Sequence, residues 1–214
     1  MPARSAQDFA ALGASWESAV ADADPEQGGE LAAAGRPEAG VQACVACHGQ
    51  QGIAAPGGAF PNLAGLNAAY IAKQLADYRN GSRPHPLMQA IAKGLGEEDI
   101  AQVAAYYGAL PAPEAVAGTA GPEPARRLHT RGDDARDLPA CANCHGARGG
   151  GEGAVLPRLA GQPKSYFIDQ MSAFRHGRRH NDEAGVMRAV ARALTPGEID
   201  ALGSYYAGMA SPRK

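Results

Sequence analysis

The sequence predicts an all-α protein built from two tandem copies of one domain. The stretch ACVACHGQQG, residues 43–52, returns as ACANCHGARG, residues 140–149. Between the copies lies PAPEAVAGTAGPEP, whose small residues, prolines and acids are typical of a linker. No clean alternating strand pattern appears in either half. The predicted parts are an N-terminal helical extension (1–24), a first domain (25–110), a linker (111–124) and a second domain (125–214).

Composition sets limits on function. Hydrophobic residues make up 45% of the 214 and charged residues 20%, as in a globular protein. The net charge of −2, without a long basic run, argues against nucleic-acid binding. No run of eighteen apolar residues is present, so no membrane span is expected. An aromatic content of 6% leaves each small domain little core, which favours a bound prosthetic group.

Helical spacing supports the individual elements. From Tyr70 to Tyr78 the apolar residues recur on one face, and Asn80-Gly81 supplies a stop. In the second domain the last helix opens with Thr195, Pro196 and Glu198, which predict a capping box.

The N-terminal extension is predicted to be an amphipathic helix over residues 5–24. Phe9, Leu12, Trp16 and Val20 share one face, after a capping pattern at Ser5-x-x-Asp8. We expect the helix to dock on the core, with recruitment of a partner as the alternative.

All four cysteines lie in the two repeated motifs, which allow three interpretations. A zinc site would pair Cys-x-x-Cys motifs about 15–20 residues apart, whereas these are separated by a whole domain. A dithiol redox site is typical of a βαβ setting, but the surroundings are helical. Cys-x-x-Cys-His is the pattern of c-type haem attachment, in which two thiols add to the haem vinyl groups and the histidine ligates iron. The repeat favours two covalently bound haem c groups, held by Cys44, Cys47, His48, Cys141, Cys144 and His145.

Met88 and Met187 are the candidate second axial ligands, because the repeat matches these two methionines to each other. A thioether suits ferrous iron and raises the potential of a His-ligated haem. The alternative for any methionine is core filling, which we expect for Met171 and Met209. The other histidines have no counterpart in the partner repeat and are expected at the surface or behind the ligands: His85, His129, His176 and His180.

Smaller matched features fit the same sites. A backbone carbonyl at Pro61 or Pro157 could hold the second ring nitrogen of the nearby histidine. The tyrosine pairs 106–107 and 205–206 are expected to pack on the haem or the core. Four matched arginines could neutralise haem propionates or lie at solvated helix ends: Arg79, Arg83, Arg175 and Arg179.

Both halves resemble the cytochrome c4 family. The resemblance rests on CVACHG, FPNLAG and YIAKQLADYRNGSR in the first half and on CANCHG, LPRLAG and YFIDQMSAFRHGRR in the second. It implies two class I cytochrome c domains related by pseudo-twofold symmetry, each with a His/Met haem, in the periplasm. By the family pattern one haem takes Cys44, Cys47, His48 and Met88, and the other takes Cys141, Cys144, His145 and Met187.

The loop before Met187 contains HNDEAG and is three residues longer than the loop before Met88. The two haem pockets are therefore expected to differ, and so are their potentials.

The predicted function is electron transfer by a periplasmic di-haem cytochrome that is not an enzyme. Its signal peptide is taken to have been removed, since residues 1–20 lack an apolar signal core. Expected partners are a quinol-oxidising complex or dehydrogenase upstream and a terminal oxidase downstream; peripheral membrane association is compatible with this. The alternative is an electron-accepting subunit or haem enzyme, of thiosulfate-oxidising or peroxidase type, with one labile haem site.

Overall fold

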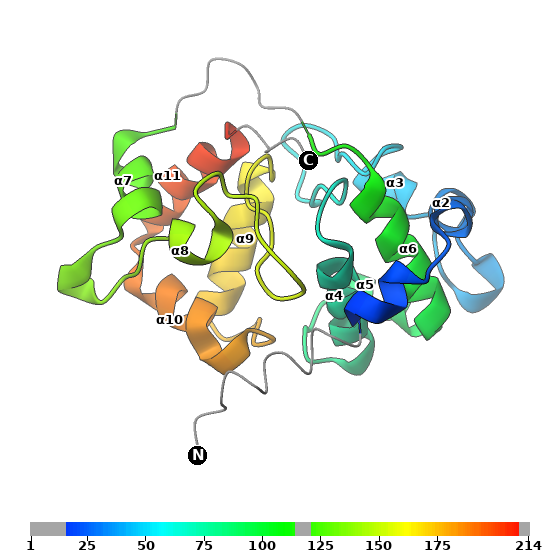
Figure 1. Ribbon diagram of the computed structural model, residues 1–214. Helices are drawn as coiled ribbons and strands as arrows, with labels where there is room; N and C mark the ends of the chain where they lie inside the picture. The colour runs from blue at the N-terminus through cyan, green and yellow to red at the C-terminus, as the bar shows by residue number, and fades with distance from the viewer. Residues whose placement is uncertain (1–15, 114–120, 210–214) are drawn as a thin grey trace.

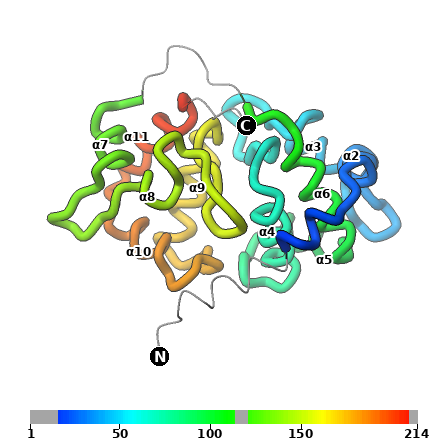
Figure 2. Tube along the Cα trace, in the orientation of Figure 1, coloured from blue at the N-terminus to red at the C-terminus, as the bar shows by residue number. Residues whose placement is uncertain are grey.

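The computed structural model describes residues 16–113 and 121–209. These form two helical lobes side by side, and the chain completes the first before starting the second (Figures 1 and 2). Across the described ranges there is no β-strand, only three isolated bridges. The all-α prediction is confirmed. None of the described helices is long and apolar enough to cross a membrane.

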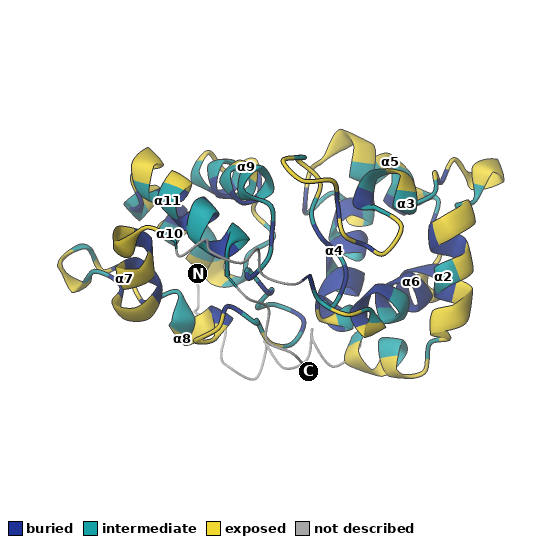
Figure 3. Cartoon of the chain, turned by 90° about the horizontal axis from the view of Figure 1, so that it is seen from above, coloured by how far each residue is buried: buried dark blue, intermediate teal, exposed yellow. Residues whose placement is uncertain are grey.

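The first domain is built from five α-helices. The bounds are α2 (Pro25–Ala34), α3 (Val45–His48), α4 (Ala68–Asn80), α5 (Pro86–Lys93) and α6 (Glu97–Ala109), with a 3₁₀ turn η1 (Pro37–Ala39). Asn67 caps α4 by accepting from the Tyr70 N–H, and Gly81 ends it in the left-handed conformation. Figure 3 shows buried residues gathered on α4 and α6 and exposed residues on outer helices such as α5.

The second domain repeats this order. Its helices are α7 (Glu123–Arg131), α8 (Ala142–His145), α9 (Lys164–Arg175), α10 (Val186–Ala193) and α11 (Pro196–Ala207), with 3₁₀ turns η2 (Asp134–Arg136) and η3 (Glu183–Gly185). The predicted capping box is confirmed, since Thr195 and Glu198 bind each other's backbone N–H at the start of α11. Helix α7 begins at Glu123, which lies inside the predicted linker, residues 111–124.

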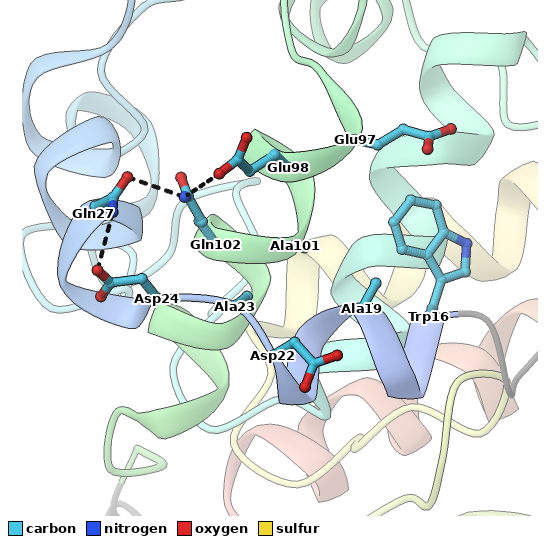
Figure 4. Close-up of a pocket in the computed structure, with 10 residues that line it drawn as sticks. All are labelled: Trp16, Ala19, Asp22, Ala23, Asp24, Gln27, Glu97, Glu98, Ala101 and Gln102. Atoms are coloured by element: carbon cyan, nitrogen blue, oxygen red, sulfur yellow. Dashed lines mark hydrogen bonds between the residues drawn. The ribbon is translucent and has the colours of Figure 1, made fainter.

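The described part of the N-terminal extension docks on the first domain, as expected. Residues 16–21 are helical, and Trp16 and Val20 pack against the first hydrophobic core. Phe9, Leu12, Ser5 and Asp8 lie outside the described residues. Between this helix, α2 and α6 is a pocket of about 480 Å³ (Figure 4). Its lining contains no cysteine, histidine or methionine. It includes Trp16 and four acidic residues, which are Asp22, Asp24, Glu97 and Glu98.

The two domains meet through a buried polar cluster with approximate twofold symmetry. Arg83 donates to Gln74 (2.8 Å), and across the interface to the Tyr166 hydroxyl (3.1 Å) and Gln170 (2.6 Å). Arg179 donates to Gln170 (2.7 Å), and across to the Tyr70 hydroxyl (3.2 Å) and Gln74 (3.2 Å). The repeated Tyr-x-x-x-Gln pattern, with the arginine that follows, therefore builds the domain interface.

A second group of contacts lacks this symmetry. Asn62 and Gln162 exchange two hydrogen bonds, from the Asn62 N–H to Oε1 (3.1 Å) and from Nε2 to the Asn62 carbonyl (2.8 Å). Arg158, the repeat counterpart of Asn62, instead donates to the Ala64 carbonyl. It is 4% exposed and its Nε has no hydrogen-bond partner among the described residues. Burial lowers the pKa of Arg158 to about 10.

Candidate functional site

Each Cys-x-x-Cys-His motif folds into one short helical turn. In α3 the N–H groups of Cys47 and His48 donate to the Cys44 carbonyl at 3.2 and 2.9 Å. In α8 the N–H groups of Cys144 and His145 donate to the Cys141 carbonyl at 3.3 and 2.9 Å. The turn brings both thiols and the imidazole of each motif close together. All four cysteines lie in the described residues, and none forms a disulfide.

The motif histidines are buried and held by a backbone carbonyl, as predicted. His48 Nδ1 lies 3.0 Å from the Pro61 carbonyl oxygen, and His145 Nδ1 lies 2.8 Å from that of Pro157. A carbonyl only accepts, so Nδ1 carries the proton and Nε2 keeps a lone pair for a metal. Burial lowers the pKa of both histidines, which favours the neutral form that can ligate iron.

Met88 and Met187 occupy matching positions near the start of α5 and α10. Both are partly buried; Met88 packs on the same core cluster as Cys44, and Met187 on the same cluster as Cys141. Met171 is buried in the second core and Met209 packs against it, so the expectation that they fill the core is confirmed.

The remaining histidines take the supporting roles expected of them. His85 is the N-cap of α5, where its Nδ1 accepts from the Met88 N–H at 3.2 Å. His176 and His180 are exposed. His129 is fully buried: its Nδ1 lies 3.0 Å from the Tyr206 hydroxyl and its Nε2 lies 3.1 Å from the Ala147 carbonyl. The sequence does not predict that His129 is buried. The one signal for its burial is its position on the apolar face of a helix.

The arginines divide into two kinds. Arg79 donates to the Leu95 carbonyl, and Arg175 to the Leu194 carbonyl, just beyond α5 and α10. Arg83 and Arg179 lie in the domain interface, 4% and 8% exposed. The expectation of solvated helix ends is therefore wrong for this second pair, because each reaches across to the opposite domain. A role toward propionates stays a prediction.

Tyr107 and Tyr206, on the last helix of each domain, are fully buried, as expected of interior aromatics. Burial raises the pKa of each, and the nearby Cys44 and Cys141 thiols raise them further. Each tyrosine hydroxyl therefore lies beside the first cysteine of its motif.

The donor set fits haem c better than the alternatives. In the described part of the chain, no three His, Cys, Asp or Glu side chains cluster as a metal site, which argues against zinc. Two free thiols one turn apart, followed by an imidazole with Nε2 available, match covalent haem attachment. Haem c supplies an iron that alternates between ferrous and ferric states.

Comparison with known proteins agrees with this geometry. Residues 31–106 match the family model described as cytochrome c oxidase, cbb3-type, subunit III, and residues 132–209 match the model for cytochrome c. The chain is 36% identical to cytochrome c4 of Stutzerimonas stutzeri, over 83% of this chain and 90% of the relative. The chain belongs to the cytochrome c4 family. It is accordingly a di-haem electron-transfer protein that carries two covalently attached haem c groups.

Solved structures place this cytochrome c4 protein in the same fold. Reduced recombinant cytochrome c4 from Pseudomonas stutzeri superposes with a TM-score of 0.76 at 32% identity, covering 87% of this chain and 99% of that one. The prediction of two class I cytochrome c domains related by pseudo-twofold symmetry is confirmed.

The prediction that the chain is not an enzyme needs correction. A relative from Stutzerimonas stutzeri strain A1501 is named thiosulfate dehydrogenase electron acceptor and is 41% identical over 79% of this chain and 80% of its own length. The thiosulfate dehydrogenase (TsdBA) structure from Marichromatium purpuratum superposes with a TM-score of 0.78 at 43% identity, over 86% of this chain. This chain spans only 40% of that one. The haem motifs do not separate an electron acceptor of this kind from a free carrier, so the sequence predicts the electron-accepting subunit only as the alternative.

Proposed function

We propose that this cytochrome c4 protein is the electron-accepting partner of a haem enzyme that oxidises thiosulfate. The similarity to the two proteins just described, which extends over both domains, supports the choice of partner. The chain would take one electron per haem, two in all, and pass them to a downstream acceptor. We also propose that this exchange takes place in the periplasm, the location that the resemblance to the cytochrome c4 family implies.

The observation that carries the electron-transfer role is the matched pair of histidine sites. In each domain a buried imidazole has Nδ1 fixed by a proline carbonyl, within 0.2 Å of the same distance. A ligand fixed in this way does not reorient when the charge on iron changes, which favours rapid electron exchange. The duplicated sites are joined by a buried polar interface, so the two can be held in one arrangement.

We assign the ligands by domain. The proposed boundaries remain 25–110 and 125–214. The proposed haem-binding residues are Cys44, Cys47, His48 and Met88 in the first domain, and Cys141, Cys144, His145 and Met187 in the second.

The partner is tested by mixing the oxidised holoprotein with purified thiosulfate dehydrogenase that lacks its own acceptor, plus thiosulfate, in a stopped-flow spectrometer. We expect uptake of two electrons per chain, at a rate proportional to enzyme concentration. The total amplitude is calibrated with dithionite. Reduction no faster than in a mixture without the enzyme would rule out this partner while leaving electron transfer intact.

The methionine ligands are tested separately. Met187→Ala should abolish the methionine–iron charge-transfer band of the second haem, whereas Met171→Ala should keep it, because Met171 lies in the core. Carbon monoxide added to the reduced wild-type protein should bind slowly, since both axial positions are filled. Rapid binding at either haem would disprove the assignment for that haem.

A second candidate is a carrier that delivers electrons to a terminal oxidase from a quinol-oxidising complex. The match of residues 31–106 to a subunit of a cbb3-type oxidase favours this candidate. Oxygen consumption by oxidase-containing membranes, supplied with the reduced holoprotein, distinguishes it: stimulation supports the oxidase, and none leaves the thiosulfate route.

A further inference from the structure

One buried position distinguishes the two haem domains. His129 on α7 and Ala32 on α2 each lie three residues before the glycine that ends the helix, Gly132 or Gly35. Both are fully buried. His129 contacts the Tyr206 ring edge-on, with centroids 5.6 Å apart, whereas alanine has no polar group to offer Tyr107.

The hydrogen bonds of His129 fix the direction of the Tyr206 hydroxyl. The Ala147 carbonyl can only accept, so His129 Nε2 carries the proton of that 3.1 Å contact. Among the described residues the hydrogen-bond partners of this buried ring are a hydroxyl and a carbonyl, and a ring with its proton on Nε2 satisfies both. Its Nδ1 is then an acceptor, and Tyr206 donates its proton to it at 3.0 Å.

In the first domain no histidine orients the corresponding hydroxyl, that of Tyr107, because Ala32 stands in the place of His129. Tyr107 Oη is buried and makes no hydrogen bond of normal geometry with any described residue. After burial, the Cys44 thiol is the group that raises the pKa of Tyr107 most, as the Cys141 thiol is for Tyr206. The Tyr107 proton is therefore free to point at the Cys44 sulfur, whereas Tyr206 presents its oxygen lone pairs to Cys141.

We propose that His129 is a positioning residue that turns the Tyr206 hydroxyl dipole and thereby lowers the midpoint potential of the second haem. The inference rests on the proposed haem attachment through Cys44 and Cys141. A thioether sulfur has no proton and can only accept. A hydroxyl that donates to it favours reduced iron, whereas lone pairs facing it favour oxidised iron.

The test is spectroelectrochemical titration of the holoprotein, with each potential assigned to its domain by paramagnetic NMR of the haem methyl groups. His129→Leu should shift the second haem to a more positive potential and leave the first unchanged. His129→Gln, which can still accept from Tyr206 and donate to Ala147, should retain part of the wild-type value.

Phenylalanine variants keep the inference falsifiable if His129→Leu does not fold. Tyr206→Phe should raise the potential of the second haem, because it removes the lone pairs that face the sulfur. Tyr107→Phe should lower the potential of the first haem, because it removes a donor. Shifts of the same sign in both domains would overturn the proposal.

Haem content separates this inference from the proposed function. Two covalent haems per chain by mass spectrometry, with an unchanged second-haem potential in His129→Leu, would overturn only the role of His129. Failure of the wild-type chain to carry haem at Cys44 or Cys141 would overturn the proposed attachment and with it the inference.

Discussion

The Cys-x-x-Cys-His motifs of the two domains have the same geometry, but the helices pack differently around them. In both, the motif forms one helical turn and a proline carbonyl holds the histidine. In the first domain α2 crosses α6 at Gly28, where an added Cβ would lie 2.0 Å from the Gln102 carbonyl oxygen. The second domain has the buried Ala125 at the matching position of α7. The groups proposed to hold the haem thus have the same arrangement in both domains, and the packing behind them differs.

An ion pair between a loop and the last helix of each domain shows the same contrast. In the first domain Arg36 binds Asp99 through two hydrogen bonds of 2.7 Å. In the second, Arg136 binds Glu198 at 2.7 and 3.1 Å. The carboxylates are repeat counterparts, but the arginines come from different positions of the preceding loop. Both domains therefore have an ion pair between this loop and the last helix, although the arginine stands at a different position of the loop in each.

The loop before Met187, which is longer than the loop before Met88, makes the domain interface asymmetric. Asn181, within HNDEAG, donates to Asp77 (2.6 Å) and Gln74 (2.9 Å) of α4. Lys73 donates to both Asp77 and the Asn181 carbonyl. The loop that precedes Met187 is therefore fastened to the first domain. The difference in potentials that the unequal loops predict remains a prediction.

Gly28→Ala tests the difference in packing between the two domains and is expected to change the stability of the protein most. The added methyl group meets a backbone carbonyl, so the free energy of unfolding should fall by about 1–3 kcal/mol, measured by urea titration. Ala125→Gly is the matched control, with a loss of at most about 1 kcal/mol from helix propensity. A stabilised Gly28→Ala variant would show that helix propensity outweighs the tight crossing.

Asn181→Ala is expected to have an intermediate effect. It removes the hydrogen bonds that Asn181 donates to the Asp77 carboxylate and the Gln74 amide, and the one it accepts from Arg179. The free energy of unfolding should therefore drop by about 1.5 kcal/mol. Scanning calorimetry should also show a larger difference between the unfolding temperatures of the two domains.

The control is Asn80→Ala, because Asn80 is exposed and its side chain, among the described residues, binds only the neighbouring Ser82 N–H. Equal losses in the two variants would mean that the long loop does not couple the domains.

The smallest effect concerns acid stability. The Arg136 guanidinium, with the Thr195 cap, lowers the pKa of Glu198 from 4.5 to about 2. A lowered carboxylate pKa stabilises the fold above pH 4.5, and this contribution is lost as the pH falls towards 2. Glu198→Gln should therefore be less stable than wild type at pH 6, with the difference vanishing near pH 2.

Unfolding by urea at several pH values measures this difference. In an Arg136→Leu background, Glu198→Gln should show a much smaller pH-dependent difference. A difference that is constant from pH 6 to 2 would mean that the ion pair contributes nothing.

The sequence by itself determined the features that depend on local spacing. The helices, the capping box, the repeat and the haem motifs were all predictable, because helical periodicity and ligand spacing act over a few residues. Even the proline carbonyls that hold His48 and His145 followed from matched positions.

Only the tertiary structure decided which distant residues meet. Three pairs that meet in the structure are far apart in the chain: Asp99 with Arg36, Tyr206 with His129, and Asn181 with Asp77. Such pairs depend on how helices cross and domains dock, which one-dimensional periodicity does not encode. For the same reason the four arginines could not be sorted in advance into helix ends and a buried interface.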